Sequence, residues 1–295
     1  MDRKIETVKI DHVTIEYSII GEGEPILIFH GGHSNCHEEF GYQALIDNGY
    51  SLITPSRPGY GKTSAEIGES LATACRYYKH LLDYLHINKV HLMAISAGGP
   101  TGIAFAAHYP EYVQSLVLQS AVTKEWLTPK DMEYKAAKLL FHPKTEKYTW
   151  KMIGSINNLV PGFIFRQMFP SFSSLKFQEA KEKFDQKDME EIRKMNNRQR
   201  SGTGFFIDLE QVNTITTEDL QAVSCPTLIM HSKHDSSVPH EHPSLAHKLI
   251  PNSELIWLDA WGHLIWLGKS ASETDKVTIH FLERNSTLKQ LPIES

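Results

Sequence analysis

The amino-acid sequence predicts an α/β protein in which a mostly parallel, doubly wound sheet carries an inserted helical cap. Short, continuously apolar segments alternate with segments of helical periodicity, the alternation stops near residue 123, and it resumes near residue 225. Continuously apolar strands are typical of parallel sheets that are covered on both faces. The alternation of such strands with helices is the pattern of doubly wound folds, whose ligands bind beyond the carboxyl ends of the strands.

Length and composition exclude several classes of function. A chain of 295 residues with 41% hydrophobic content can bury a sizeable core, and its net charge of -5 gives no reason to expect nucleic acid. No apolar segment approaches the roughly 20 residues that cross a membrane, and the N-terminus is too charged for a signal peptide. Three scattered cysteines do not suggest disulfides. We therefore expect a cytoplasmic protein without a membrane partner, whose oligomeric state the sequence does not define.

The first elements are expected to be a hairpin followed by buried strands. Residues 8–20 alternate polar and apolar side chains, which predicts an exposed antiparallel hairpin that ends at the turn residues 21–25. Helices are expected at residues 71–85 and 98–108, the second with Pro100 in its first turn. The continuously apolar segments predict buried strands at residues 26–29, 51–54, 90–95, 116–118 and 227–230, and residues 255–258 are expected to form a further strand.

The segment from residue 123 to residue 217 has helical character only. We predict that it is a cap inserted into a core formed by residues 1–122 and 218–295. Prolines are expected to break the cap into short helices; they are Pro129, Pro143, Pro161 and Pro170. Most of its large apolar residues should pack the cap onto the core, and some should line an apolar pocket. These residues are Trp150, Met152, Ile153, Leu159, Val160, Phe163, Ile164, Phe165, Met168 and Phe169.

The sharpest local pattern surrounds Ser96. A buried strand at residues 90–95 leads into this serine, small residues occupy positions 94 and 98, and a helix begins directly afterwards. A sharp strand-to-helix turn strains the serine backbone, raises its hydroxyl above the sheet edge and tolerates only small neighbours. A serine that merely caps a helix is a common alternative. The combination of strand, small residues and helix favours the strained turn.

Three further segments end predicted strands. Residues 27–32, with the sequence LIFHGG, end in glycines, which let the backbone approach a ligand closely. Asp235 lies in the sequence HSKHDSSVP, and His263 ends the sequence DAWGH after the last predicted strand. An aspartate after a strand often serves only a turn, but Val238 and Pro239 accompany this one.

Together these four segments resemble the α/β-hydrolase family. They match, in the family's order, its HG-x oxyanion loop, its G-x-S-x-G nucleophile turn, its G-x-x-D-x-x-V-P acid loop and its final G-H loop. Ala94 and His231 stand where the family usually has glycine. The resemblance extends over nearly the whole chain outside the cap.

The resemblance implies a site and a mechanism. Ser96 would be the nucleophile, His263 its base and Asp235 the acid that orients the histidine. The backbone N–H groups of Gly32 and Ala97 would bind the oxyanion, with His33 as the alternative first donor. No cofactor and no metal is required by this mechanism.

Two other patterns are interpreted as scaffold. His30, His33 and His37 have spacings that suggest a metal, but the first is explained by the oxyanion loop and no cysteine or carboxylate cluster completes a site. Residues 57–63 look like a phosphate loop yet lack the G-x-x-x-x-G-K-[ST] spacing. In the family this segment is a structural turn.

The expected function is that of a serine hydrolase acting on a small, apolar ester. An aminopeptidase, a carbon–carbon bond hydrolase or a cofactor-free haloperoxidase would use the same fold, and the fold alone does not separate them. A ligand sensor with slow turnover is the alternative from another class. Turnover on short-chain aryl esters discriminates the sensor from the enzymes.

Overall fold

The structure contains the sheet that the sequence predicts, and its eight strands have the order β1-β2-β4-β3-β5-β6-β7-β8. The computed structural model describes residues 2–286. β1 and β2 are antiparallel to each other and β2 is antiparallel to β4, whereas all other neighbours are parallel. The predicted fold class is therefore confirmed. The strands are β1 (Lys4–Ile10), β2 (Val13–Ile20), β3 (Glu24–Phe29), β4 (Tyr50–Pro55), β5 (Val90–Ile95), β6 (Val113–Gln119), β7 (Thr227–Ser232) and β8 (Ser253–Leu258).

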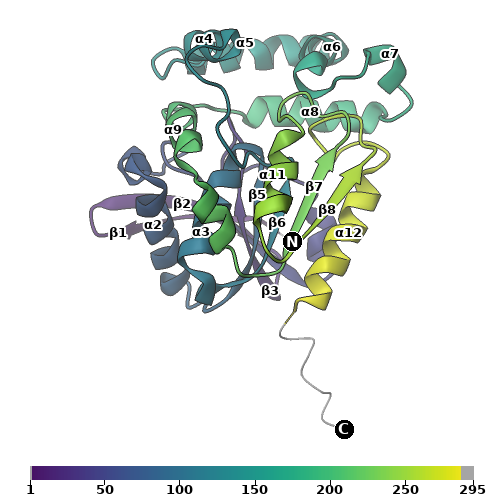
Figure 1. Cartoon of the computed structure of the whole chain (residues 1–295). Helices are drawn as coiled ribbons and strands as arrows, with labels where there is room; N and C mark the ends of the chain where they lie inside the picture. Colours follow the sequence, from purple (N-terminus) through teal and green to yellow (C-terminus); the bar gives the residue numbers. More distant parts are fainter. Residues whose placement is uncertain (1, 287–295) are drawn as a thin grey trace.

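Helices cover both faces of this sheet (Figure 1). Successive side chains of a strand point to opposite faces, so Ile26 and Ile28 of β3 pack with α1 (Tyr42–Asp47) and α12 (Ala271–Arg284). Leu27 and Phe29 pack on the other face. The helices on that other face are α2 (Leu71–Tyr84), α3 (Gly99–His108), α10 (Thr217–Ala222) and α11 (Glu241–Leu249). Burial on both faces explains why the strands are continuously apolar.

The N-terminal hairpin forms where expected, but only its first strand is exposed. Ile15 and Tyr17 of β2 are buried. β2 lies between β1 and β4 in the sheet, and Tyr77 and Leu81 of α2 cover one of its faces. The expectation of an exposed hairpin is therefore wrong for β2, because pairing with β4 makes it an interior strand.

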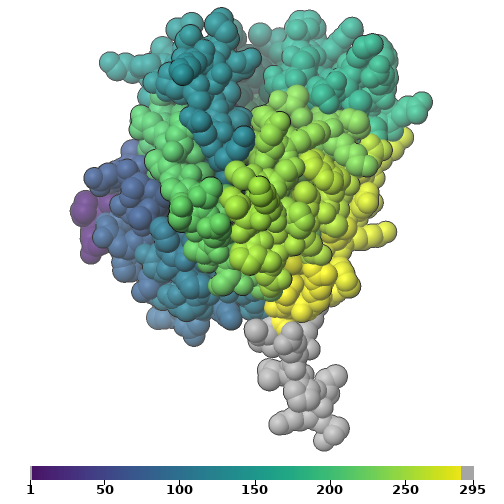
Figure 2. Space-filling view, in the orientation of Figure 1, coloured from purple at the N-terminus to yellow at the C-terminus, as the bar shows by residue number. Residues whose placement is uncertain are grey.

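A set of helices lies over the carboxyl ends of the parallel strands (Figure 1). Figure 2 shows the same segment in teal at the top of the molecule. Pro161 begins α6, as expected of a proline in the first helical turn. Pro170 does not break this helix, which continues to Phe172. The division into a core and a cap at residues 123–217 stays a prediction. The helices in this segment are α4 (Met132–Leu140), α5 (Glu146–Leu159), α6 (Pro161–Phe172), α7 (Phe177–Ala180), α8 (Gln186–Arg198) and α9 (Gly204–Gln211).

The large apolar residues of this segment divide into a buried and an exposed group. Phe165 and Phe169 are buried and their rings contact Trp261 of the core. These contacts are of the kind that was expected between the cap and the core. Met152, Leu159, Val160 and Phe163 are exposed instead. No helix in residues 2–286 is both long and apolar enough to cross a membrane.

Candidate active site

Ser96 occupies a strained turn between β5 and α3. Its φ of 52° lies in the left-handed region, which non-glycine residues seldom adopt. The Ser96 carbonyl oxygen accepts from Val122 N–H at 2.9 Å. A Cβ on Gly98 would lie 2.2 Å from the Phe29 carbonyl oxygen, so only glycine fits there. The structure therefore has the turn geometry that the small neighbours of Ser96 predicted.

Ala94 departs from the family pattern, and the structure accommodates it through Gly102. A Cβ on Gly102 of α3 would lie 2.4 Å from the Cβ of Ala94, far inside contact distance. The extra methyl group on the strand is therefore matched by a missing one on the helix. The sequence showed both residues, but only the packing of β5 against α3 relates them.

The structure brings Ser96, His263 and Asp235 together. They follow β5, β8 and β7, respectively, at the carboxyl ends of these strands. His263 Nε2 lies 2.9 Å from Ser96 Oγ, and His263 Nδ1 lies 2.7 Å from Asp235 Oδ2. Because a carboxylate oxygen can only accept, Nδ1 carries the proton in this arrangement and Nε2 presents its lone pair to the serine hydroxyl.

The Asp235 carboxylate is held by its own loop. Its Oδ1 accepts from the backbone N–H groups of Ser237 at 2.8 Å and Val238 at 3.0 Å. Burial alone would raise the pKa of Asp235, but the electrostatic interaction and hydrogen bond with His263, together with the Val238 N–H, outweigh it, so that the pKa lies below its usual value. Asp235 is therefore ionised at neutral pH.

Two residues near Asp235, Asp259 and His231, bear on the prediction that Asp235 is the acid. Asp259, the alternative acid that lies nearest to His263 in sequence, is 66% exposed and binds Lys183 Nζ at 2.7 Å and His234 Nε2 at 3.1 Å. His231, which replaces the glycine of the family's acid loop, lies with Nε2 2.9 Å from the Val238 carbonyl oxygen. Burial lowers the pKa of His231 to about 4, so this ring is neutral and supports the acid loop.

The loop at Gly31 and Gly32 approaches the serine. A Cβ on Gly31 would lie 3.3 Å from the Cβ of Ser96, and a Cβ on Gly32 would lie 3.8 Å from that of Ala97. His33 N–H donates to the Tyr60 hydroxyl at 3.3 Å, whereas residues 2–286 offer Gly32 N–H no backbone acceptor. This difference favours Gly32 over His33 as the first oxyanion donor. Ala97, the second predicted donor, directly follows Ser96 at the start of a 3₁₀ turn.

Three buried residues beside this loop were not predicted from the sequence. Arg57 and Tyr60, interpreted as part of a structural turn, both contact Asp208 of α9. All three are buried. One signal was available: Asp208 is the single charge in the apolar sequence FFIDL, and a charge in an apolar helix face needs a buried partner.

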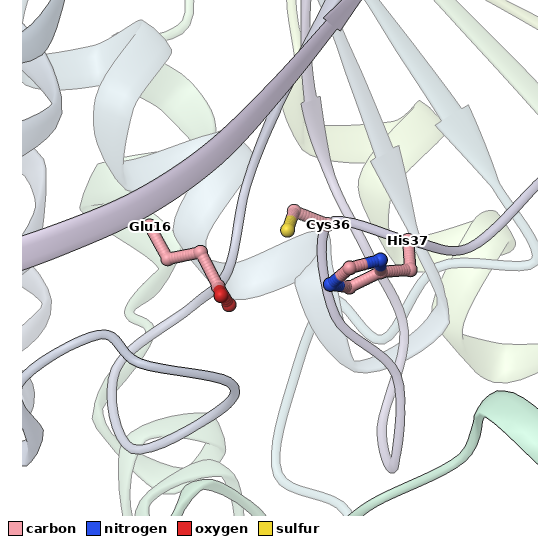
Figure 3. A group of neighbouring side chains, drawn as sticks. All are labelled: Glu16, Cys36 and His37. Carbon is pink, nitrogen blue, oxygen red and sulfur yellow. The ribbon is translucent and has the colours of Figure 1, made fainter. Parts of the chain in front are cut away.

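A group of possible metal ligands is distinct from Ser96, His263 and Asp235. In the described part of the chain, Glu16, Cys36 and His37 offer ligand atoms within 4.8 Å of one another (Figure 3). Burial raises the pKa of Cys36 to about 11, and the Glu16 carboxylate already accepts from Ser56 Oγ at 3.0 Å. The adjoining cavity is also lined by cations, which repel a metal ion; they are Arg3, Lys62, Arg198 and Arg200. His30 and His33 do not belong to this group.

Comparison with known proteins identifies the family. The family model described as "alpha/beta hydrolase fold" matches residues 24–269. The chain therefore belongs to the α/β-hydrolase family. The match begins at β3 and includes Ser96, Asp235 and His263.

Individual relatives place the chain among hydrolases. It is 59% identical over 283 residues to "Uncharacterized hydrolase YcgS" of Bacillus subtilis (strain 168), with 96% of this chain and 100% of that protein covered. It is 29% identical over 175 residues to a 2-hydroxy-6-oxo-6-phenylhexa-2,4-dienoate hydrolase of Comamonas testosteroni, with 56% of this chain and 58% of that protein covered. Among solved structures, an α/β-hydrolase fold protein from Nakamurella multipartita superposes with a TM-score of 0.81 at 23% identity, covering 96% of this chain and 100% of that one.

Proposed function

We propose that this chain is a serine hydrolase that cleaves a small, apolar ester through an acyl-enzyme on Ser96. The observation that carries the proposal is the unbroken series of contacts from Ser96 Oγ to His263 Nε2 at 2.9 Å and from His263 Nδ1 to Asp235 Oδ2 at 2.7 Å. A serine hydroxyl is a weak nucleophile until a base within hydrogen-bond distance takes its proton. His263 is such a base, and Asp235 holds it in the required tautomer.

The reaction proceeds in two halves. Ser96 Oγ attacks the ester carbonyl carbon while its proton moves to His263 Nε2, and the N–H groups of Gly32 and Ala97 stabilise the oxyanion. The intermediate collapses, His263 returns the proton to the departing alcohol, and the acyl group remains on Ser96. Water then attacks this ester, again with His263 as base, and releases the acid. This cycle uses no cofactor.

Aromatic residues next to the oxyanion loop support the preference for an apolar substrate. The rings of Phe141 and Phe205 both lie 4.2 Å from the ring of His33, and Trp150 stacks on Phe141 at 5.1 Å. A Cβ on Gly32 would lie 3.9 Å from Phe205. An acyl or alcohol group bound near Gly32 therefore meets aromatic side chains, which favour apolar ligands.

A carbon–carbon bond hydrolase is the second candidate function. The Comamonas testosteroni relative, whose name states a dienoate substrate, favours it. Both reactions use a serine, a histidine and an oxyanion site, so the discriminating property is the bond that is broken rather than the site geometry.

A substrate panel tests the proposal. Steady-state rates would be measured on aryl esters of increasing acyl length, lactones, aminoacyl arylamides and a ring-cleavage dienoate, with Ser96→Ala as the control. We expect the highest kcat/KM on a short apolar aryl ester and none above background for Ser96→Ala. A higher kcat/KM on the dienoate would replace the first function with the second. Binding of panel compounds without turnover of any would contradict both and favour the sensor.

A further inference from the structure

We propose that Arg57 and Asp208 are positioning residues that fix the peptide between Gly31 and Gly32 in the orientation required to bind the oxyanion. The proposal rests on the proposed function, because it concerns the same oxyanion site. The juxtaposition that supports it is a buried arginine that contacts the oxyanion loop on one side and a carboxylate of α9 on the other.

Arg57 holds the carbonyl side of this peptide. Its Nη2 donates to the Gly31 carbonyl oxygen at 3.2 Å, and its Nε donates to the His30 carbonyl oxygen at 2.7 Å. The described chain has no cis peptide bonds. In a trans peptide the N–H points opposite to the carbonyl, so Gly32 N–H points away from Arg57. Ser96 is the neighbour of Gly31, and Ala97 is a neighbour of Gly32.

His30 fixes the same carbonyl from a second direction. Its Nδ1 donates to the Gly31 carbonyl oxygen at 2.8 Å, while its Nε2 accepts from Arg57 N–H at 2.9 Å. The two contacts together require the neutral tautomer with the proton on Nδ1. Burial lowers the pKa of His30 well below its usual value, which agrees with this tautomer. The Gly31 carbonyl therefore has two fixed donors.

Asp208 in turn fixes Arg57 and one further position on the loop. Both carboxylate oxygens of Asp208 accept from Arg57, with Nη2 at 2.8 Å from Oδ2. The same Oδ2 accepts from the Tyr60 hydroxyl at 2.7 Å, and that hydroxyl accepts from His33 N–H at 3.3 Å. Without Asp208, Arg57 would have an unpaired buried charge and Tyr60 would lose its acceptor.

The helix that carries Asp208 is fixed on the core beside the loop. The Gly59 carbonyl oxygen accepts from Thr203 N–H and Gly204 N–H at 3.2 and 3.1 Å, and Gln211 Nε2 donates to the Gly68 carbonyl oxygen at 3.0 Å. The sequence placed Asp208 in the cap. By this proposal, the last cap helix supports the oxyanion site in addition to covering the substrate.

Asp208→Asn tests the proposal, because it keeps the shape of the side chain and removes its charge. Rates per active site would be measured on the best ester, together with the inhibition constant of a trifluoromethyl ketone that forms an oxyanion on Ser96. Removal of one oxyanion donor lowers kcat about 10²- to 10³-fold. Because Asp208→Asn should displace the Gly32 N–H rather than remove it, we expect kcat to fall about 10- to 100-fold with little change in KM. Ketone affinity should fall by the same factor, because the adduct resembles the transition state.

Glu38→Gln is the matched control. It also removes a buried carboxylate that joins the core to a cap helix, since Glu38 Oε1 accepts from Arg198 Nε at 3.0 Å, but it does not touch the oxyanion loop. We expect nearly unchanged kcat and ketone affinity for this variant. If kcat and ketone affinity fell equally in both variants, the effect would come from weaker packing of the cap on the core in general, and the proposal would be wrong.

Other outcomes separate the two proposals. A ketone adduct on wild-type Ser96 with unchanged or increased kcat in Asp208→Asn overturns the positioning role and leaves the proposed function intact. No adduct on wild-type Ser96 overturns both. If Asp208→Asn does not fold, Arg57→Lys provides the test, because it keeps a positive charge for Asp208 and removes the guanidinium that donates to the His30 and Gly31 carbonyl oxygens. A loss of kcat and ketone affinity is expected there, and no loss overturns the proposal.

Discussion

Asp235→Asn should fix His263 in the wrong tautomer, and the hydrogen bonds around Asp235 show why. An asparagine has one oxygen, and at the Oδ1 position that oxygen would accept from Ser237 N–H at 2.8 Å and Val238 N–H at 3.0 Å. An amide nitrogen placed there would face two donors. At the Oδ2 position it faces His231 Nε2 at 3.3 Å and His263 Nδ1, which becomes an acceptor when the ring changes tautomer. The amide oxygen therefore takes the Oδ1 position.

This orientation directs the amide nitrogen at His263 Nδ1, which lies 2.7 Å from the present Oδ2. The nitrogen donates, Nδ1 must accept, and the ring proton moves to Nε2. Nε2 then presents N–H instead of a lone pair to Ser96 Oγ at 2.9 Å. The variant also loses the charge that stabilises the imidazolium. We expect kcat to fall by about 10⁴-fold, as for the same change in a serine-protease triad, which corresponds to roughly 5 kcal/mol.

The assay compares steady-state rates of wild type, Asp235→Asn and Asp259→Asn on the best ester, with thermal unfolding measured for each. Asp259 is the control because it is an aspartate of the neighbouring loop that binds Lys183 and His234 instead of His263. Its variant should retain nearly full activity. The reasoning is refuted if the kcat of folded Asp235→Asn stays within about tenfold of wild type, or if Asp259→Asn is the variant that loses activity.

Two further predictions concern stability. Gly102→Ala should destabilise the fold by about 1–3 kcal/mol, because its methyl group overpacks against Ala94. Adding Ala94→Gly to this variant should restore most of the lost stability, which denaturant unfolding of the single and double variants would measure. Additive losses in the double variant would contradict the contact. Acid should also destabilise the protein, because burial lowers the pKa of His231 to about 4 and that of His242 to about 3. As the pH falls below about 6.5, the ordinary pKa of histidine, the unfolded chain binds more protons than the folded chain. Each of these histidines should therefore lower the free energy of unfolding by about 2 kcal/mol between pH 7 and pH 5. Denaturant unfolding at both pH values checks this, and equal stabilities would contradict it.

Local patterns were sufficient for the elements that depend on neighbouring residues in the sequence. The strand predicted at residues 90–95 coincides with β5, and the small residues around Ser96 predicted its strained turn. The order of the four loops also placed Ser96, Asp235 and His263 beside one another. These features follow from alternating strands and helices, whose connecting loops meet at one edge of a parallel sheet.

Features that depend on packing between distant segments were not predictable in this way. Arg57 and Asp208 are 151 positions apart, and only the folded chain places the arginine against the backbone of His30 and Gly31. The burial of β2 likewise follows from its pairing with β4, which the hairpin pattern does not encode. The role of Gly102 as the complement of Ala94 required the contact between a helix and a strand.

Covalent labelling with a fluorophosphonate tests the central claim most directly, because only an activated serine reacts readily with this probe. Wild-type protein would be labelled, digested and analysed by mass spectrometry, with Ser96→Ala and His263→Gln as controls. We predict one adduct on the peptide that contains Ser96, no adduct in Ser96→Ala and much slower labelling in His263→Gln. An adduct on a different serine, or none in protein that hydrolyses esters, would contradict the assignment of Ser96 as the nucleophile.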